Sequence, residues 1–251
     1  VFVVAKPVRN VTVNILFRNG VSGQAWFDDI GLQELQVSGG LFFDRTSATR
    51  PPGATASPAG RASASLATRD GLKLTFDSIG RPASFAADGK PLLGAGPGGF
   101  WLRDVAANGP WLRPRCTVST SKTGATFAGE EKAAGLKLQA TADSSTTGLD
   151  FHVTVTDTTG QDRAVTAYFV LPLADLPWTW HDDILHSMPT AGGEYMNASG
   201  WPISGLSSAY PWCSLTSPQV GLSLGVPMDC PRVARMVYNG DLKALYIACD
   251  L

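Results

Sequence analysis

The sequence carries little charge and little histidine, and it lacks any long hydrophobic run. Charged residues make up 16% of the 251 residues, the net charge is −1, and three residues are histidine. A near-neutral chain offers no electrostatic basis for binding nucleic acid or an anionic membrane surface. No apolar run approaches the length of a membrane span, and no signal peptide opens the chain. We therefore expect no nucleic-acid partner and no membrane span.

Several catalytic and metal-binding motifs are also missing. No HExxH pair and no GxxxxGK[ST] loop occurs. The four cysteines, Cys116, Cys213, Cys230 and Cys249, show neither a CxxC pair nor the spacing of a zinc site. No cysteine lies next to an activating histidine, which argues against a cysteine nucleophile. One disulfide, two disulfides and four free thiols all remain open.

What the sequence does contain is a succession of short strand-like runs separated by turns. Glycine (27) and proline (17) are frequent, and Asp88-Gly89 is a hairpin signal. Alternating or continuous apolar runs predict strands at 71–77, 83–93, 116–121, 125–128, 136–142, 149–156, 165–173, 219–226, 232–238 and 242–249. We predict an all-β chain whose main part is a large antiparallel β-sandwich.

Composition suggests a division of the chain into three parts. Residues 46–65 are rich in Pro, Ala, Ser, Thr and Gly and contain few large apolar groups, which is typical of a linker. Before it, residues 1–45 contain strand-like runs at 3–17 and 23–35. After it, residues 66–251 form the expected sandwich domain.

The run GQAWFDDIGLQEL at 23–35 resembles the closing strand of a jelly-roll carbohydrate-binding module. In that family this strand often carries an aspartate that helps to hold a structural calcium, which the resemblance places at Asp28. On a strand Asp28 shares a face with Ile30 and Leu32, where an unpaired carboxylate would be costly. Asp28 either ligates a cation or is solvated at the strand end. Two or three strands are too few for a jelly roll, so we expect the rest of that module upstream.

A second resemblance covers residues 66–251. The runs DSIGRPASFAADGKPLL, GFWLRDV, AYPWCSL, GLSLGVPMDCPR and LYIACDL resemble the β-sandwich that precedes the catalytic barrel in large bacterial glycoside hydrolases, often of the galactose-mutarotase-like supersandwich kind. The resemblance implies a secreted or cell-surface, multidomain protein. It also implies that the catalytic domain lies downstream and outside this chain.

Residues 176–212 hold half of the twelve Trp and Tyr residues and two of the three histidines. We interpret the segment as a long excursion between strands, where a β-protein often carries its function. Indole faces flanked by polar groups suit oligosaccharides or polysaccharides. The alternative is that these aromatics close one end of the sandwich core. The candidate sugar-binding residues are Trp178, Trp180, His181, Asp182, Glu194, Trp201, Tyr210 and Trp212, with Trp180 and Trp201 the leading candidates for exposed platforms.

The same segment contains the one acid–base cluster, at 180–186. Its histidines, His181 and His186, are five residues apart, and Asp182 and Asp183 would point to opposite sides of a strand. We therefore predict an ancillary, non-catalytic region of a glycoside hydrolase-like protein. Two alternatives stay open, a non-enzymatic extracellular structural or adhesion segment, and a supersandwich lyase or epimerase that uses His181 and Glu194.

Overall fold

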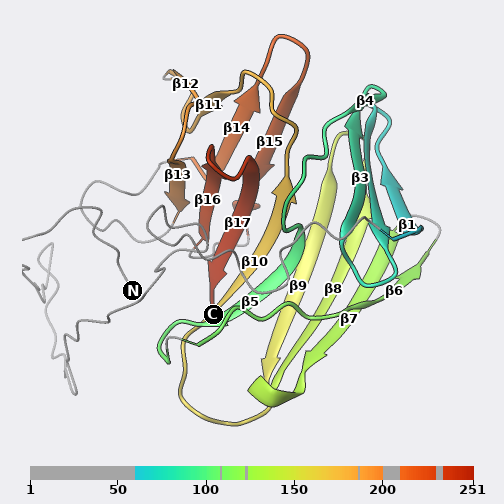
Figure 1. Ribbon diagram of the computed structural model, residues 1–251, viewed down its shortest axis with the longest axis vertical. Coiled ribbons are helices and arrows are strands. Elements are labelled where there is room, and N and C mark those ends of the chain that lie inside the picture. The colour runs from blue at the N-terminus through green and yellow to red at the C-terminus, as the bar shows by residue number, and fades with distance from the viewer. Residues whose placement is uncertain (1–59, 108, 122–123, 186, 200–209, 230–233) are drawn as a thin grey trace, which may run out of the picture.

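The computed structural model describes residues 60–251 except 108, 122–123, 186, 200–209 and 230–233. These residues form four antiparallel sheets, so the all-β prediction is confirmed (Figure 1). The predicted strands at 3–17 and 23–35, with Asp28, lie outside the described residues. No helix among the described residues is long and apolar enough to cross a membrane.

The first two sheets are meanders, built from strands in chain order. One has the order β1-β2-β3-β4, with bounds Ala62–Ala67, Leu72–Asp77, Pro82–Ala87 and Lys90–Pro91. The other has the order β6-β7-β8-β9, with bounds Thr117–Thr120, Gly124–Glu131, Leu136–Ser144 and Leu149–Asp157, and a single 3-10 turn at Lys132–Ala134. Asp88 and Gly89 have φ of 49° and 75°, as a tight hairpin turn requires, which confirms the predicted hairpin.

The third sheet, called here the five-stranded sheet, collects strands from distant parts of the chain. Its order is β13-β16-β17-β10-β5, with bounds Glu194–Ser199, Ala234–Asn239, Ala244–Asp250, Val165–Pro172 and Gly99–Asp104. The fourth, called the β14 sheet, has the order β12-β11-β14-β15, with bounds Met188–Pro189, Thr179–His181, Trp212–Thr216 and Gly221–Gly225. Figure 1 shows strands β14 and β15 in the same half of the molecule as β16 and β17.

Two sequence-based boundaries need correction. Strand β1 begins at Ala62, inside the predicted linker 46–65, because Ala64 and Leu66 alternate with exposed residues and are buried. The predicted excursion at 176–212 contains strands β11, β12 and β13 and the first residue of β14. Its strands are short, and polar residues interrupt them, so apolar periodicity could not show them.

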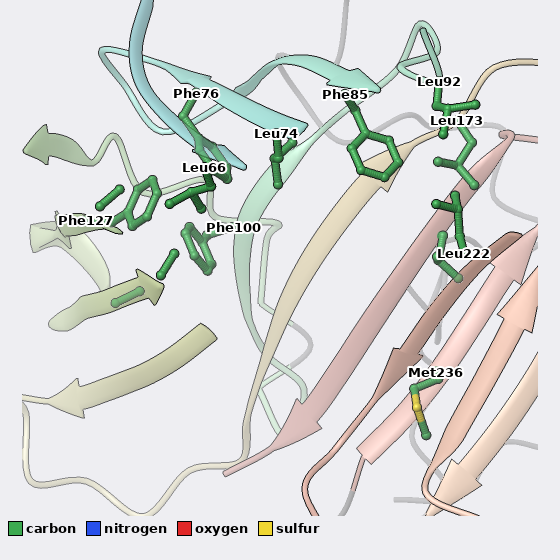
Figure 2. Packing of buried hydrophobic residues seen from close by; sticks show 14 of the residues in the cluster. Leu66, Leu74, Phe76, Phe85, Leu92, Phe100, Phe127, Leu173, Leu222 and Met236 are labelled. Carbon is green, nitrogen blue, oxygen red and sulfur yellow. The ribbon is translucent and has the colours of Figure 1, made fainter. Parts of the chain in front are cut away.

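One hydrophobic cluster draws residues from all four sheets. Phe127 lies near Phe76 and Phe100 (Figure 2). Its ring is edge-on to both, with centroid separations of 4.9 Å and 5.4 Å. Farther along the core, Leu92, Leu173 and Leu222 gather in the same view. Because side chains alternate along a strand, the neighbours of Phe76, Phe100 and Phe127 point to the opposite faces of their sheets.

The opposite face of the five-stranded sheet carries a second buried cluster. Trp101, Tyr168, Val170, Val237, Ala244, Tyr246 and Ala248 belong to it. Register supports this grouping, since Tyr168 lies opposite Trp101 on one side and Ala248 on the other. The five-stranded sheet is therefore packed on both of its faces.

Candidate functional site

Two of the predicted sugar-binding tryptophans are core residues. Trp178 and Trp180 are each 1% exposed. Trp180 lies opposite Leu215 in the β14 sheet, and its ring centroid is 6.3 Å from that of Tyr195. The Trp178 indole donates a hydrogen bond to the Ala174 carbonyl at 3.2 Å. The prediction that Trp180 is an exposed platform is wrong, because strand alternation turns it inward while Thr179 and His181 turn outward.

His181 and Glu194 are engaged in different sheets. The Nε2 of His181 lies 2.8 Å from the Thr216 hydroxyl in the β14 sheet. Glu194 Oε1 accepts hydrogen bonds from the Tyr246 hydroxyl at 3.2 Å and the Asn239 amide at 3.3 Å, both in the five-stranded sheet. These contacts give each side chain a local structural partner. None of them joins the imidazole to the carboxylate.

Tyr246, which donates a hydrogen bond to Glu194, and Tyr168 are poor candidates for general bases. Burial raises the pKa of Tyr168 to about 12, and burial together with the Glu194 charge raises the pKa of Tyr246 well above its usual range. Both phenols therefore stay protonated at neutral pH and act as hydrogen-bond donors. Nearby, Asp250 Oδ1 accepts from Arg235 Nη2 at 2.6 Å and from the Thr166 hydroxyl at 2.8 Å. These polar groups lie on the same face of the five-stranded sheet as its second buried cluster.

The outer face of the β14 sheet combines one large aromatic with several small polar groups. Trp212, Ser214 and Thr216 alternate with the buried Cys213 and Leu215. Antiparallel pairing places His181 opposite Ser214, Thr179 opposite Thr216, and Ser223 opposite Ser214 on the other side. Directly opposite residues share a face, so these hydroxyls and the imidazole lie on the same side as Trp212.

Beside Trp212, one neighbouring position has no side chain and another holds an aromatic ring. Its cross-strand partner is Gly225, which contributes no side chain. The Tyr210 and Trp212 ring centroids are 6.3 Å apart with planes inclined at 53°. Both rings are half-buried, unlike the two core tryptophans. This pair is the part of the predicted aromatic set that the structure places near the surface.

Asn197 fixes the backbone beneath this pair. Its side-chain amide donates to the carbonyls of Tyr210 at 3.0 Å and of Trp212, and at 3.5 Å to that of Asp182. The residue is 2% exposed, although Asn197-Ala198-Ser199 matches the glycosylation pattern. A glycan on Nδ2 would replace one of the two amide hydrogens and disrupt this set of contacts. The amide therefore ties strand β13 to the start of β14 and the end of β11.

The same end of the β14 sheet exposes large aliphatic side chains. Ile184 and Leu185 follow β11 and are 70% and 81% exposed, and Met228 follows β15 and is 84% exposed. Because β11 and β15 both run antiparallel to β14, their ends lie beside the start of β14, where Trp212 stands. Half-exposed Asp182 and Asp183 lie in the loop with Ile184.

Three of the predicted or possible site residues, Asp28, Trp201 and His186, fall outside the described residues. Within 60–251, less the gaps given above, no group of three His, Cys, Asp or Glu side chains is arranged to hold a metal ion. Cys116 and Cys213 are free thiols there. Burial raises the pKa of Cys116 to about 11 and that of Cys213 still further, so neither is poised as a nucleophile.

Sequence reasoning missed the polar residues that share the outer face with Trp212 or fix its backbone. Ser214, Thr216, Ser223 and Asn197 were not among the candidates, although the WCSLT run alternates apolar and polar residues from Trp212 onward. That alternation was the available signal for Ser214 and Thr216. Asn197 gave no signal, because its partners are 13 and 15 residues away along the chain.

Comparisons with known proteins identify no relative of this chain. No protein-family model, no curated protein and no solved structure gives a significant match to the chain.

Proposed function

We propose that this chain is an ancillary carbohydrate-binding region of a secreted, multidomain glycoside hydrolase-like protein. In this proposal the four sheets make up its galactose-mutarotase-like β-sandwich, and the sugar lies on the outer face of the β14 sheet. The supporting observation is the half-buried Tyr210–Trp212 pair beside a row of hydroxyl and imidazole groups.

The chemistry of this face suits a sugar ring. A pyranose has apolar C–H faces that pack on an aromatic ring, and a rim of hydroxyls that need hydrogen-bond partners. Trp212 offers the aromatic surface. Ser214, Thr216 and Ser223 can donate and accept, and the His181–Thr216 contact holds the imidazole in place.

The hydrogen bonds that Glu194 and His181 make favour a binding function over a catalytic one. Sugar hydrolysis needs two carboxyl groups that face each other across the scissile bond. Glu194 is held in the five-stranded sheet by Tyr246 and Asn239, whereas His181 is held in the β14 sheet by Thr216. The lyase or epimerase alternative would need these two groups together, and no contact in the described residues supports it.

The test is a titration of the protein with neutral oligosaccharides, followed by tryptophan fluorescence and calorimetry. Trp212→Ala should weaken binding at least tenfold, because anchor aromatics carry much of the affinity of such sites. Gly225→Ala adds a methyl group 3.3 Å from Trp212 Cβ and 3.1 Å from the Pro211 carbonyl, and should also weaken binding.

Gly221→Ala is the matched control for Gly225→Ala. It lies on the same strand and face but opposite Thr216, and its added methyl group meets Thr216 Cγ2 at an ordinary 3.8 Å. It should weaken binding less than Gly225→Ala does, because it leaves the surroundings of Trp212 unchanged. Absence of any glycan binding by the wild-type protein, or equal affinities for wild type and Trp212→Ala, would overturn the proposal.

A second candidate function is a structural or adhesion segment that docks on a protein partner. The observation that favours it is the exposure of Ile184, Leu185 and Met228 at one end of the β14 sheet, since solvent-exposed aliphatics of this size often mark interfaces. Under this alternative, Leu185→Ser and Met228→Ser would abolish partner binding. They would leave glycan titrations of the isolated chain unchanged, because neither residue is on the outer face of the sheet.

A further inference from the structure

The outer face of β14 carries a row of side chains that is longer than one sugar ring. Trp212, Ser214 and Thr216 occupy alternate positions of the strand and therefore lie in line on this face. At about 3.4 Å per residue, the four-residue step from Trp212 to Thr216 covers about 14 Å. The indole stands at one end of the row, and the Thr216 hydroxyl, bonded to His181, stands at the other. A single pyranose stacked on Trp212 would leave the Thr216 end empty.

Strand β15 leaves this row open along one side. The β15 residues that share the outer face lie directly opposite the row and are Gly225, Ser223 and Gly221. All three are exposed, and the two glycines contribute no side chain. On the other side of the row, Thr179 and His181 of β11 supply the neighbouring side chains. A pocket for the end unit of a chain needs walls around that unit, whereas an open row admits a chain that continues beyond it.

The hydroxyls in the middle of the row are available to a ligand. Ser214 and Ser223 lie opposite each other, and neither side chain makes a hydrogen bond within the part of the chain that the structure describes. Each hydroxyl can donate one hydrogen bond and accept two. The outer-face positions of β14 and β15 include no carboxylate, lysine or arginine, so their chemistry suits the neutral hydroxyl rim of successive sugar units.

We propose that the ligand of this face is an internal stretch of a linear, neutral polysaccharide that lies lengthwise along β14. One unit stacks on Trp212, and a later unit reaches Thr216. This inference rests on the proposed carbohydrate-binding function and specifies its ligand class. A free sugar or a chain end would use the Trp212 end alone, and an internal stretch uses the whole row.

Calorimetric titration with neutral oligosaccharides of one linkage, from the disaccharide to the hexamer, tests the inference. We expect affinity to rise with length and then to level off, with the hexamer bound about tenfold tighter than the disaccharide, because the added units bond to the hydroxyls of the row. A hexamer with a blocking group at either end should bind as tightly as the unblocked hexamer.

Two results would overturn this inference and leave the carbohydrate-binding proposal standing. One is a hexamer that binds no tighter than the disaccharide. The other is a loss of hexamer binding when one of its ends is blocked, which would identify a chain end as the ligand. Absence of binding at every length would overturn both proposals.

Gly221→Leu obstructs the row at its Thr216 end. A Cβ added at this exposed position lies at an ordinary 3.8 Å from Thr216 Cγ2, so the strand can accept the side chain. Affinity for the hexamer should fall about fivefold, because the new side chain clashes with the later units, while affinity for the disaccharide stays unchanged. Thr141→Leu adds the same side chain to an exposed position of β8 and should change neither affinity. An equal loss for both ligands in Gly221→Leu would contradict the lengthwise arrangement.

Discussion

Trp180→Ala gives a direct test of the distinction between a core tryptophan and a surface tryptophan. Trp180 is 1% exposed, lies opposite Leu215 and packs near Tyr195. Truncation removes the whole indole and leaves a cavity that the surrounding sheets can fill only in part. A buried tryptophan cut to alanine costs about 3–5 kcal/mol of unfolding free energy. For a protein of this size that cost lowers Tm by about 6–20 °C.

The assay is urea denaturation of wild type, Trp180→Ala and Trp212→Ala, followed by far-ultraviolet circular dichroism. A fall in the midpoint at constant slope reports a loss of stability without a change in the surface exposed on unfolding. Trp212 is half-buried, so its truncation should cost about 1 kcal/mol. Trp180→Phe retains an aromatic ring and should fall between wild type and Trp180→Ala.

The relative stabilities of Trp180→Ala and Trp212→Ala test whether Trp180 is a core residue and Trp212 a surface residue. If Trp180→Ala were as stable as wild type to within about 0.5 kcal/mol, the indole could not be a core element. If Trp212→Ala were the more damaging of the two, the assignment of the outer face would be wrong, because the larger cavity would lie beneath Trp212.

Three further predictions concern other parts of the chain. If Asp28 ligates calcium, chelator should lower Tm of a protein that includes the rest of the jelly-roll module, and Asp28→Ala should remove that sensitivity. An unchanged melting curve of that protein in chelator would exclude the site. A fragment of residues 60–251 should unfold in one cooperative transition, and a loss of cooperativity relative to the full chain would mean that residues 1–59 contribute to the same folding unit. Burial raises the pKa of Asp77, but hydrogen bonds from Arg81 and the Ile79 amide outweigh burial and hold the pKa below its usual value. The ionised Asp77 carboxylate therefore stabilises the folded state above about pH 4, and this stabilisation is lost as the pH falls through the lowered pKa. Asp77→Asn should therefore flatten the acid limb of the stability–pH curve, and an identical limb in the variant would contradict this.

Strand periodicity predicted most of the fold where strands are long and alternate regularly. The run at 149–156 alternates apolar and polar residues and is strand β9, Leu149–Asp157. Asp88-Gly89 marked a hairpin because both residues readily adopt positive φ. In these regions local preference and tertiary packing agree, and the sequence is sufficient.

The site was harder to predict because its strands are short and its contacts are long-range. Trp178 and Trp180 are two residues apart, the spacing of side chains on one face of a strand, but Pro177 and the following polar residues favoured a loop interpretation. Trp180 packs near Leu215 and Tyr195, which are 35 and 15 residues away along the chain. No local pattern could supply that information. The choice between platform and core therefore needed the structure.

The central claim is that a sugar contacts Trp212 on the outer face of the β14 sheet, and the indole N–H signals of the seven tryptophans test it directly. In a nitrogen-15 correlation spectrum the Trp212 signal is identified by its absence from Trp212→Phe. On addition of oligosaccharide we predict a shift of the Trp212 signal with saturation, while the signals of the buried Trp178 and Trp180 stay in place. A titration in which Trp212 does not move, or in which Trp178 and Trp180 move instead, would contradict the account.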